Sequence, residues 1–276
     1  MGFRISTNVQ SISAQRTLNM QREAQNHQFE KLSSGERIVR AADDAAGLAI
    51  SEKFKAEIRS VRQASRNAQD GISLVQVAEG GLSEVGNILI RLRELSIQSA
   101  NDTLTDTDRS FVDREVQSLK GEVDRIAQST RFNGLDLLNG KGLDLEFQVG
   151  TGSNPDRDRI AFPMSTNEVT TEKLGIPDIT ASTKLDAQGN LDKLDAAIAL
   201  VSDRRASFGA MQNRLQSTIN NLAVNDENLS AANSRIRDAD IALETAELTK
   251  RNILAQSSVA TLAQANQNSV MALKLI

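Results

Sequence analysis

All three prolines of this 276-residue chain fall in one short window. They are Pro155, Pro163 and Pro177, so residues 1–154 and 178–276 contain none. Proline inside a helix removes a backbone hydrogen bond and clashes with the preceding turn, at a cost of about 3 kcal/mol. The distribution therefore permits very long helices on both sides of an irregular middle segment.

The segment from Asp44 to Asn101 carries a stripe of apolar residues at heptad spacing. The stripe consists of Phe54, Val61, Ala68, Val75, Leu82 and Leu89. A period of seven sustained over this length predicts one long helix that packs along a partner in coiled-coil fashion. Glycines interrupt the pattern, each about 1 kcal/mol less favourable than alanine. We expect the helix to bend or break near Gly80-Gly81.

Two further helices are predicted from their start signals and apolar spacing. Thr105 and Asp108 form a capping-box-like start, and the apolar residues that follow recur at a strict 4-3 spacing. This helix should end near the turn signal Phe132-Asn133-Gly134. A third long helix is predicted over about residues 190–235, where the apolar residues hold a continuous 3-4 register.

Between these helices the pattern changes from helical to alternating. Apolar and polar residues alternate over 143–149 and again over 160–164, with a Gly- and Pro-containing turn between them. This predicts one hairpin followed by an irregular continuation to about residue 190. The fold class is therefore mainly α: a long coiled-coil-like helical rod with one small β-hairpin region.

The two ends of the chain differ from the rod. Residues 6–33 have few large apolar side chains among Gln, Asn, Arg and Glu, and residues 241–276 are rich in Ala, Ser, Asn and Gln. Such narrow faces do not stabilise an isolated helix, because helical stability in proteins comes mostly from packing. Both ends need partners.

The composition provides few of the side chains that catalysis and metal binding commonly use. The chain has one His and no Cys, which excludes disulfides, Cys-based zinc sites and Cys/His nucleophile pairs. His27 lies in a polar helical stretch and is interpreted as a solvated or hydrogen-bonding side chain. Asp43-Asp44 is interpreted as a helix start, where an anionic cap meets the helix dipole, rather than as a catalytic pair. We predict that the chain is not an enzyme and holds no cofactor or metal.

The charges argue against nucleic-acid and membrane partners. Thirty-two Lys and Arg stand against thirty-six Asp and Glu, and the two signs are mixed along the chain, unlike a phosphate-binding footprint. No window approaches the roughly 18 apolar residues of a membrane span, and the N-terminus lacks an apolar run of signal-peptide length. A cytosolic protein fits, as does one exported without a cleaved signal peptide.

Several specific runs of residues resemble bacterial flagellin, over about 1–140 and 190–276. The runs are Ile5-Ser6-Thr7-Asn8, Leu32-Ser33-Ser34-Gly35, the stretches 43–51 and 64–74, Arg93-Glu94-Leu95, Phe132-Asn133-Gly134 and the stretch 234–240. The resemblance implies an extracellular filament subunit of the bacterial flagellum that serves swimming motility. Only about fifty residues separate the second and third rod helices, so the large variable outer domain of many relatives is expected to be absent.

The resemblance also implies a domain plan. Residues 1–43 plus 234–276 would form a terminal helical core domain that is ordered in the filament. Residues 44–233 would form the rod domain, with the hairpin and irregular region at about 140–190. Filament-core packing is expected at Ile5, Ile12, Ile241, Leu248, Leu262 and Ile276.

The partners implied by the resemblance are other proteins. They are further copies of the chain in a helical homopolymer, the flagellar export machinery and flagellin chaperone, the hook-associated and cap proteins, and an animal innate immune receptor. By motif alignment the receptor contacts fall on Arg91, Leu95 and Glu115. A neighbouring position that is often Gln in the family is Ile90 here, which removes a polar partner.

Three alternatives remain open from the residues. A hook–filament junction protein shares the terminal helices, although the extended match over 43–74 favours flagellin. Some flagellin-like chains carry an inserted protease, but this sequence has no His-Glu-x-x-His and no room for the insertion. A non-flagellar coiled-coil scaffold would leave the unusual ends unexplained.

Overall fold

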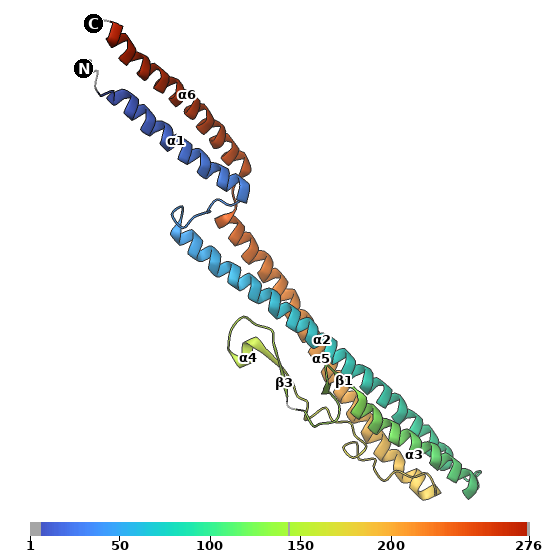
Figure 1. The fold of residues 1–276 in the computed structure, drawn as a ribbon. Helices are drawn as coiled ribbons and strands as arrows, with labels where there is room; N and C mark the ends of the chain where they lie inside the picture. Colours follow the sequence, from blue (N-terminus) through green and yellow to red (C-terminus); the bar gives the residue numbers. More distant parts are fainter. Residues whose placement is uncertain (1–6, 143, 275–276) are drawn as a thin grey trace. The chain divides into compact units, whose positions relative to one another are not determined.

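Six helices and two short β-hairpins make up the described part of the chain (Figure 1). The computed structural model describes residues 7–142 and 144–274, with side chains described to residue 267. The helices are α1 (Val9–Ser34), α2 (Ala45–Ser99), α3 (Asp106–Ser129), α4 (Pro155–Asp158), α5 (Lys184–Arg237) and α6 (Ile241–Lys274). The mainly α fold class is thus confirmed. No described helix is long and apolar enough to span a membrane.

The chain divides into two compact units. One comprises residues 1–58 and 227–276, and the other comprises residues 59–226. The division falls within α2 and α5, so each of these helices contributes to both units. The boundaries predicted from the sequence, at 43/44 and 233/234, concern the assembled state and stay a prediction.

The core of the unit formed by residues 59–226 is built from the predicted stripes. On α2, Ala68, Val75, Leu82 and Leu89 are fully buried, and Val61 is nearly so. On α3 the most buried residues are Val116, Val123 and Ala127, and on α5 they include Leu194, Val201, Phe208 and Leu215. Heptad spacing brings each set to one face of its helix, so three helices bury one continuous apolar seam.

Helix α2 runs unbroken through Gly80 and Gly81, so the predicted break is wrong. The reason is packing. A Cβ atom built on Gly81 would lie 2.7 Å from Oγ1 of Thr130 and 2.8 Å from Cδ1 of Leu138. The glycine therefore lets the chain after α3 approach the helix closely, and tertiary contact outweighs its low helix propensity.

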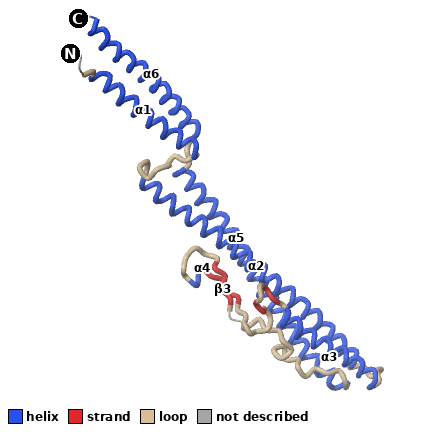
Figure 2. The backbone as a smooth tube through the Cα atoms, in the orientation of Figure 1, coloured by secondary structure: helices blue, strands red, loops and turns tan. Residues whose placement is uncertain are grey.

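The structure contains one more hairpin than the single hairpin expected (Figure 2). Strands β3 (Leu145–Gln148) and β4 (Arg159–Phe162) form the predicted antiparallel pair, with Leu145 opposite Phe162. The additional hairpin joins β1 (Arg131–Phe132) to β2 (Leu135–Asp136). Its turn is Asn133-Gly134, both at positive φ, as two-residue hairpin turns require.

Phenylalanines fix the β3–β4 hairpin to the helices. Phe162 stacks on Phe208 of α5 with ring centroids 5.4 Å apart, and Phe147 meets Phe162 edge-on at 6.5 Å. Phe147 also covers Gly71 of α2, where a Cβ would lie 3.2 Å from its ring. Three of the eight phenylalanines of the chain thus pack where this hairpin meets the helices.

The irregular segment before α5 is held by polar side chains of α3. Asp113 accepts the N–H of Ala181 at 2.7 Å, and Asp124 accepts the N–H of Thr171 at 2.8 Å. Between these two, Gln117 and Lys120 donate to backbone carbonyls at 3.0 and 2.6 Å. Helix α5 begins at Lys184, earlier than the predicted residue 190, because Thr183 accepts the N–H of Asp186 as a cap.

Candidate assembly surface

Helices α1 and α6 lie side by side as an antiparallel pair (Figure 1). Asn8 Nδ2 donates to the carbonyl of Ala265 at 2.9 Å, and Gln25 Nε2 donates to Asn252 Oδ1 at 2.6 Å. Ser11 Oγ adds a third link to Asn266 Oδ1 at 2.8 Å. These are exposed or part-buried polar contacts, each contributing about 0.5–1.5 kcal/mol at most.

Most large apolar side chains of this pair face solvent. Among the described residues of the two helices only Leu18 and Ala265 are buried apolar residues. The exposed set comprises Val9, Ile12, Met20, Phe29, Ile241, Leu243, Ile253, Leu254 and Val259. Soluble monomers rarely leave such a set uncovered, so its exposure marks an interaction surface.

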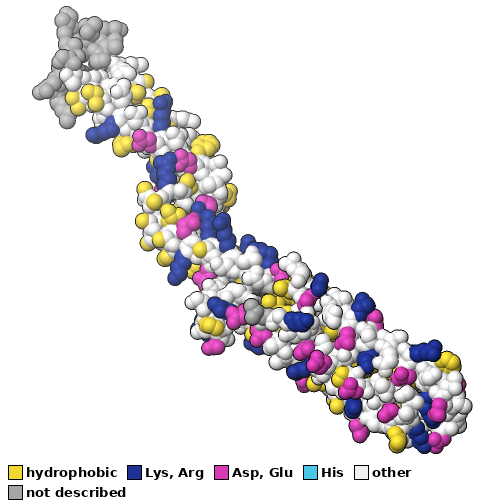
Figure 3. Space-filling view, turned by 60° about the horizontal axis from the view of Figure 1, so that its bottom comes forward, with side chains coloured by type: hydrophobic (Ala, Val, Ile, Leu, Met, Phe, Trp, Pro, Cys, Tyr) yellow, Lys and Arg dark blue, Asp and Glu magenta, His cyan; other side chains and the backbone are white. Residues whose placement is uncertain are grey.

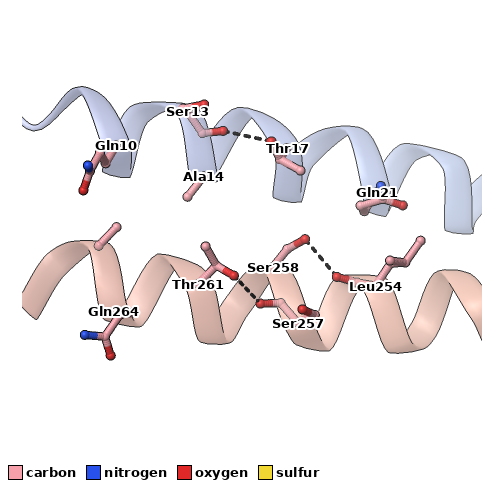
Figure 4. A pocket seen from close by; sticks show the side chains of 11 residues that line it. Gln10, Ser13, Ala14, Thr17, Gln21, Leu254, Ser257, Ser258, Thr261 and Gln264 are labelled. Atoms are coloured by element: carbon pink, nitrogen blue, oxygen red, sulfur yellow. Dashed lines mark hydrogen bonds between the residues drawn. The ribbon is translucent and has the colours of Figure 1, made fainter.

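A cavity of about 530 Å³ lies between α1 and α6 (Figure 4). Small side chains line it, including Ala14, Ser13, Ser257 and Ser258. Three of its hydroxyl groups donate within their own helices: Thr17 donates to Ser13 O, Ser258 to Leu254 O and Thr261 to Ser257 O, all at 2.8–3.0 Å. The described residues contain no cluster of His, Cys, Asp and Glu suited to a metal. Nothing in this cavity forms a nucleophile–base arrangement.

Four of the six filament-core residues predicted from the sequence fall on this pair. Ile12 and Ile241 are 58% and 52% exposed. Leu248 and Leu262 are half-buried. Ile5 and Ile276 lie outside the described residues.

The segments next to the helix pair are tied together by Arg237, the last residue of α5. Its Nε lies 2.8 Å from Oε1 of Glu36, and its Nη1 lies 2.5 Å from Oε1 of Glu52. These two carboxylates, Glu36 first, raise the pKa of Arg237. Backbone hydrogen bonds reinforce the tie, since Arg37 N donates to Arg237 O at 2.6 Å and Ala239 N to Gly35 O at 2.9 Å. This cluster could not be predicted from the sequence, because its members are distant in sequence and follow no periodicity.

Asp43 and Asp44 both accept hydrogen bonds from backbone N–H groups, before and at the start of α2. Asp44 Oδ1 accepts the N–H of Gly47 at 2.8 Å at the start of α2. Asp43 Oδ2 accepts the N–H groups of Val39 and Arg40, and Oδ1 lies 2.9 Å from Nε2 of His27. The N–H of Arg40 is the main cause that lowers the pKa of Asp43, and burial opposes it. The helix-start interpretation is therefore confirmed for Asp44. Asp43 instead holds the loop before α2, and His27 has a hydrogen-bonding role.

The three residues aligned with receptor contacts are not equally accessible. Arg91 forms ion pairs of 3.0 Å with Glu94 and with Glu115 of α3, and all three side chains are about half exposed. Hydrogen bonds to Glu94 and then Glu115 raise the pKa of Arg91. Leu95 is 1% exposed and lies in the core. The side chain of Leu95 is thus covered by the core in this structure, and its receptor contact stays a prediction.

The surface charges are interspersed. On the face shown in Figure 3, Lys and Arg alternate with Asp and Glu over the described residues. Many of these side chains are paired, as in Arg62–Asp226 at 3.1 Å and Arg93–Asp195 at 2.6 Å. Ion pairs of this kind partly neutralise the surface charge of the described residues.

Two family models match the chain. The bacterial flagellin N-terminal helical region matches residues 5–142, and the bacterial flagellin C-terminal helical region matches residues 191–276. A flagellin of Halalkalibacterium halodurans is 46% identical over 272 residues, covering 99% of both chains. A flagellin of Bacillus subtilis is 41% identical over 310 residues, covering 99% of this chain and 100% of its own. The flagellar filament 33 kDa core protein of Treponema phagedenis is 42% identical over 288 residues, covering 99% of both.

Two solved structures of flagellar proteins are also similar to this chain. The crystal structure of Bacillus cereus flagellin matches with a TM-score of 0.51 and 34% identity, covering 57% of this chain and 88% of its own. A putative flagellar hook-associated protein from Vibrio parahaemolyticus matches with a TM-score of 0.59 at 14% identity, covering 71% of this chain and 100% of its own. The second likeness concerns the fold alone.

Proposed function

Because this chain belongs to the bacterial flagellin family, as a short form without a large outer domain, we propose that the α1–α6 pair is the surface through which it polymerises. The chain is a structural subunit of the bacterial flagellar filament. The observation that supports the α1–α6 assignment is the set of large apolar side chains left exposed on both helices. Heterologous contacts that do not close into a ring generate a helical filament, which is the geometry proposed for these surfaces.

Energetics support assembly as the event that orders this pair. Fixing one residue costs about 1–2 kcal/mol in backbone entropy, and apolar burial returns roughly 25 cal/mol per Å². The pair buries little apolar area within one chain. Neighbouring subunits would supply the rest, so we place residues 1–43 and 234–276 in the filament core.

Electron microscopy of the purified protein tests the proposal directly. Long helical filaments are expected from the intact chain, and a chain shortened by residues 241–276 should form none. Filaments of normal length from the shortened chain would overturn the assignment of the α1–α6 pair.

The other proposed partners are inferred from membership of the flagellin family. The proposed subunit is exported unfolded through the flagellar export machinery with its chaperone, and it joins hook-associated and cap proteins outside the cell. The absence of Cys supports this route, because no cross-link can form during export. Catalysis has no place in the proposal: a hydrolase activity that survived purification and disappeared on a point substitution would contradict it.

Recognition by the animal innate receptor for flagellin is proposed for the exposed ion pair of Arg91 and Glu115. The supporting observation is that both charged side chains lie together on the surface, with Ile90 exposed beside them. A receptor assay with single alanine variants tests this face.

A further inference from the structure

Two asparagines directly precede glycines, and they lie in contrasting surroundings. Asn133-Gly134 forms the exposed turn between β1 and β2. Asn139-Gly140 lies beyond β2, where Asn139 is 9% exposed. The same dipeptide therefore occurs once in solvent and once in a packed setting.

The carboxamide of Asn139 is held at both ends. Its Nδ2 donates to Asp136 Oδ2 at 2.7 Å, and its Oδ1 accepts the N–H of Lys141 at 3.0 Å. Glu168 covers the following glycine, since a Cβ on Gly140 would lie 2.9 Å from that side chain. Rotation of this carboxamide toward the backbone would break both hydrogen bonds.

Asn133 has no such restraint. Its side chain makes no hydrogen bond to any described residue, and the N–H of Gly134 donates to none of them. The strands on either side are only two residues long, and a hairpin of this size opens readily. Gly134 carries no Cβ to hinder attack by its nitrogen.

We propose that Asn133 is a site of spontaneous deamidation in the folded protein. The backbone nitrogen of Gly134 attacks Cγ of Asn133 and forms a new C–N bond. The Cγ–Nδ2 bond breaks, and ammonia leaves with the proton that Gly134 gave up. Water then opens the cyclic imide at either carbonyl, so the products are an aspartyl or an isoaspartyl linkage plus ammonia. No oxidant or cofactor is required.

The modification changes both charge and geometry of the turn. Each product adds a carboxylate to an exposed site. The isoaspartyl linkage also lengthens the backbone by one carbon within a two-residue turn, which disrupts the pairing of Phe132 with Leu135.

One tryptic peptide measures both sites at once. Cleavage after Arg131 and Lys141 releases residues 132–141, which contain Asn133 and Asn139. The full-length protein is incubated at neutral pH, digested at intervals, and fragmented in a mass spectrometer to place the amide-to-acid mass increase. Since reaction at Asn139 must first break two hydrogen bonds, Asn133 should convert about tenfold faster or more. In urea the two rates should converge.

Two variants isolate the cause. Asn133→Gln should abolish the fast conversion and leave the rate at Asn139 unchanged. Asp136→Ala removes the acceptor of the Asn139 amide and should accelerate conversion there. The proposal is overturned if Asn139 converts as fast as Asn133 in the folded protein. It is also overturned if Asn133 stays intact in the folded protein under conditions in which Asn139 converts once urea has unfolded the chain.

Discussion

Arg237 Nη1 lies 2.5 Å from Oε1 of Glu52, although 185 residues separate the two in sequence. Arg237 ends α5, and Glu52 lies in the second turn of α2. The same guanidinium pairs with Glu36, so one side chain joins three chain segments within the unit formed by residues 1–58 and 227–276.

Arg237→Ala should destabilise this unit by about 1–2 kcal/mol. The reason is that Glu36 and Glu52 lose the cation that they share and the charge-assisted hydrogen bonds that it donates. Urea unfolding measures the loss. Arg235→Ala is the matched control, since it removes an exposed positive charge from the same helix end. Equal effects of the two variants would show that the loss of helix-end charge, not the cluster, is responsible.

Gly80→Ala and Gly81→Ala should change stability in opposite directions. A Cβ at Gly80 meets nothing within 4 Å, so alanine there should stabilise α2 by up to about 1 kcal/mol. A Cβ at Gly81 would collide with Thr130 and Leu138, so alanine there should destabilise the protein. Both free energies of unfolding come from the same denaturant titration. A stabilising Gly81→Ala would mean that the chain after α3 does not pack as described.

Removing residues 241–276 should separate folding from assembly. The circular-dichroism unfolding transition of the rod should remain largely intact, because its seams lie on α2, α3 and α5. Polymerisation should be lost. Hydrogen exchange on the intact monomer provides a second measurement: the chain ends should exchange faster than residues 54–92, and equal protection would contradict the division.

Arg91→Ala and Glu115→Ala should each weaken activation of the innate receptor while leaving the fold intact, since both side chains are exposed. Arg93→Ala serves as the control, because Arg93 pairs with Asp195 of α5 instead. Leu95→Ala should instead destabilise the protein by about 2–5 kcal/mol, as expected for a buried leucine. A receptor response indifferent to Arg91 and Glu115 would refute the proposed face.

The contribution of Asp43 to stability should depend on acid pH. The N–H of Arg40 first, and His27 among the lesser causes, hold the pKa of Asp43 below its ordinary value of 3.8. A group with a lowered folded pKa stabilises the native state above its unfolded pKa, and this stabilisation is lost as pH falls through the folded value. Asp43→Asn should therefore be less stable than wild type at neutral pH. The difference between their free energies of unfolding should decrease below pH 3.8. Asp203→Asn, at an exposed site on α5, is the matched control variant.

The local features of the fold could be predicted because their causes are local. The Thr105–Asp108 capping box starts α3 as expected, since both partners lie within one helical turn. The buried positions Val75 and Leu82 follow from heptad spacing. The Asn133-Gly134 turn signal was recognised, but not the two-residue hairpin that it closes, because strands this short have no periodicity.

The sequence by itself determined the long helices and the β3–β4 hairpin, because proline placement and apolar period act over neighbouring residues. It also determined that the chain has few side chains suited to catalysis, because that follows from composition alone. Only the tertiary structure decided that Gly81 is a packing contact, that Leu95 is buried and that Arg237 joins Glu36 to Glu52. Each of these depends on which distant segment lies against the residue. A helical period specifies which face is apolar, whereas the neighbour that covers a given position is chosen by the packing of the whole unit.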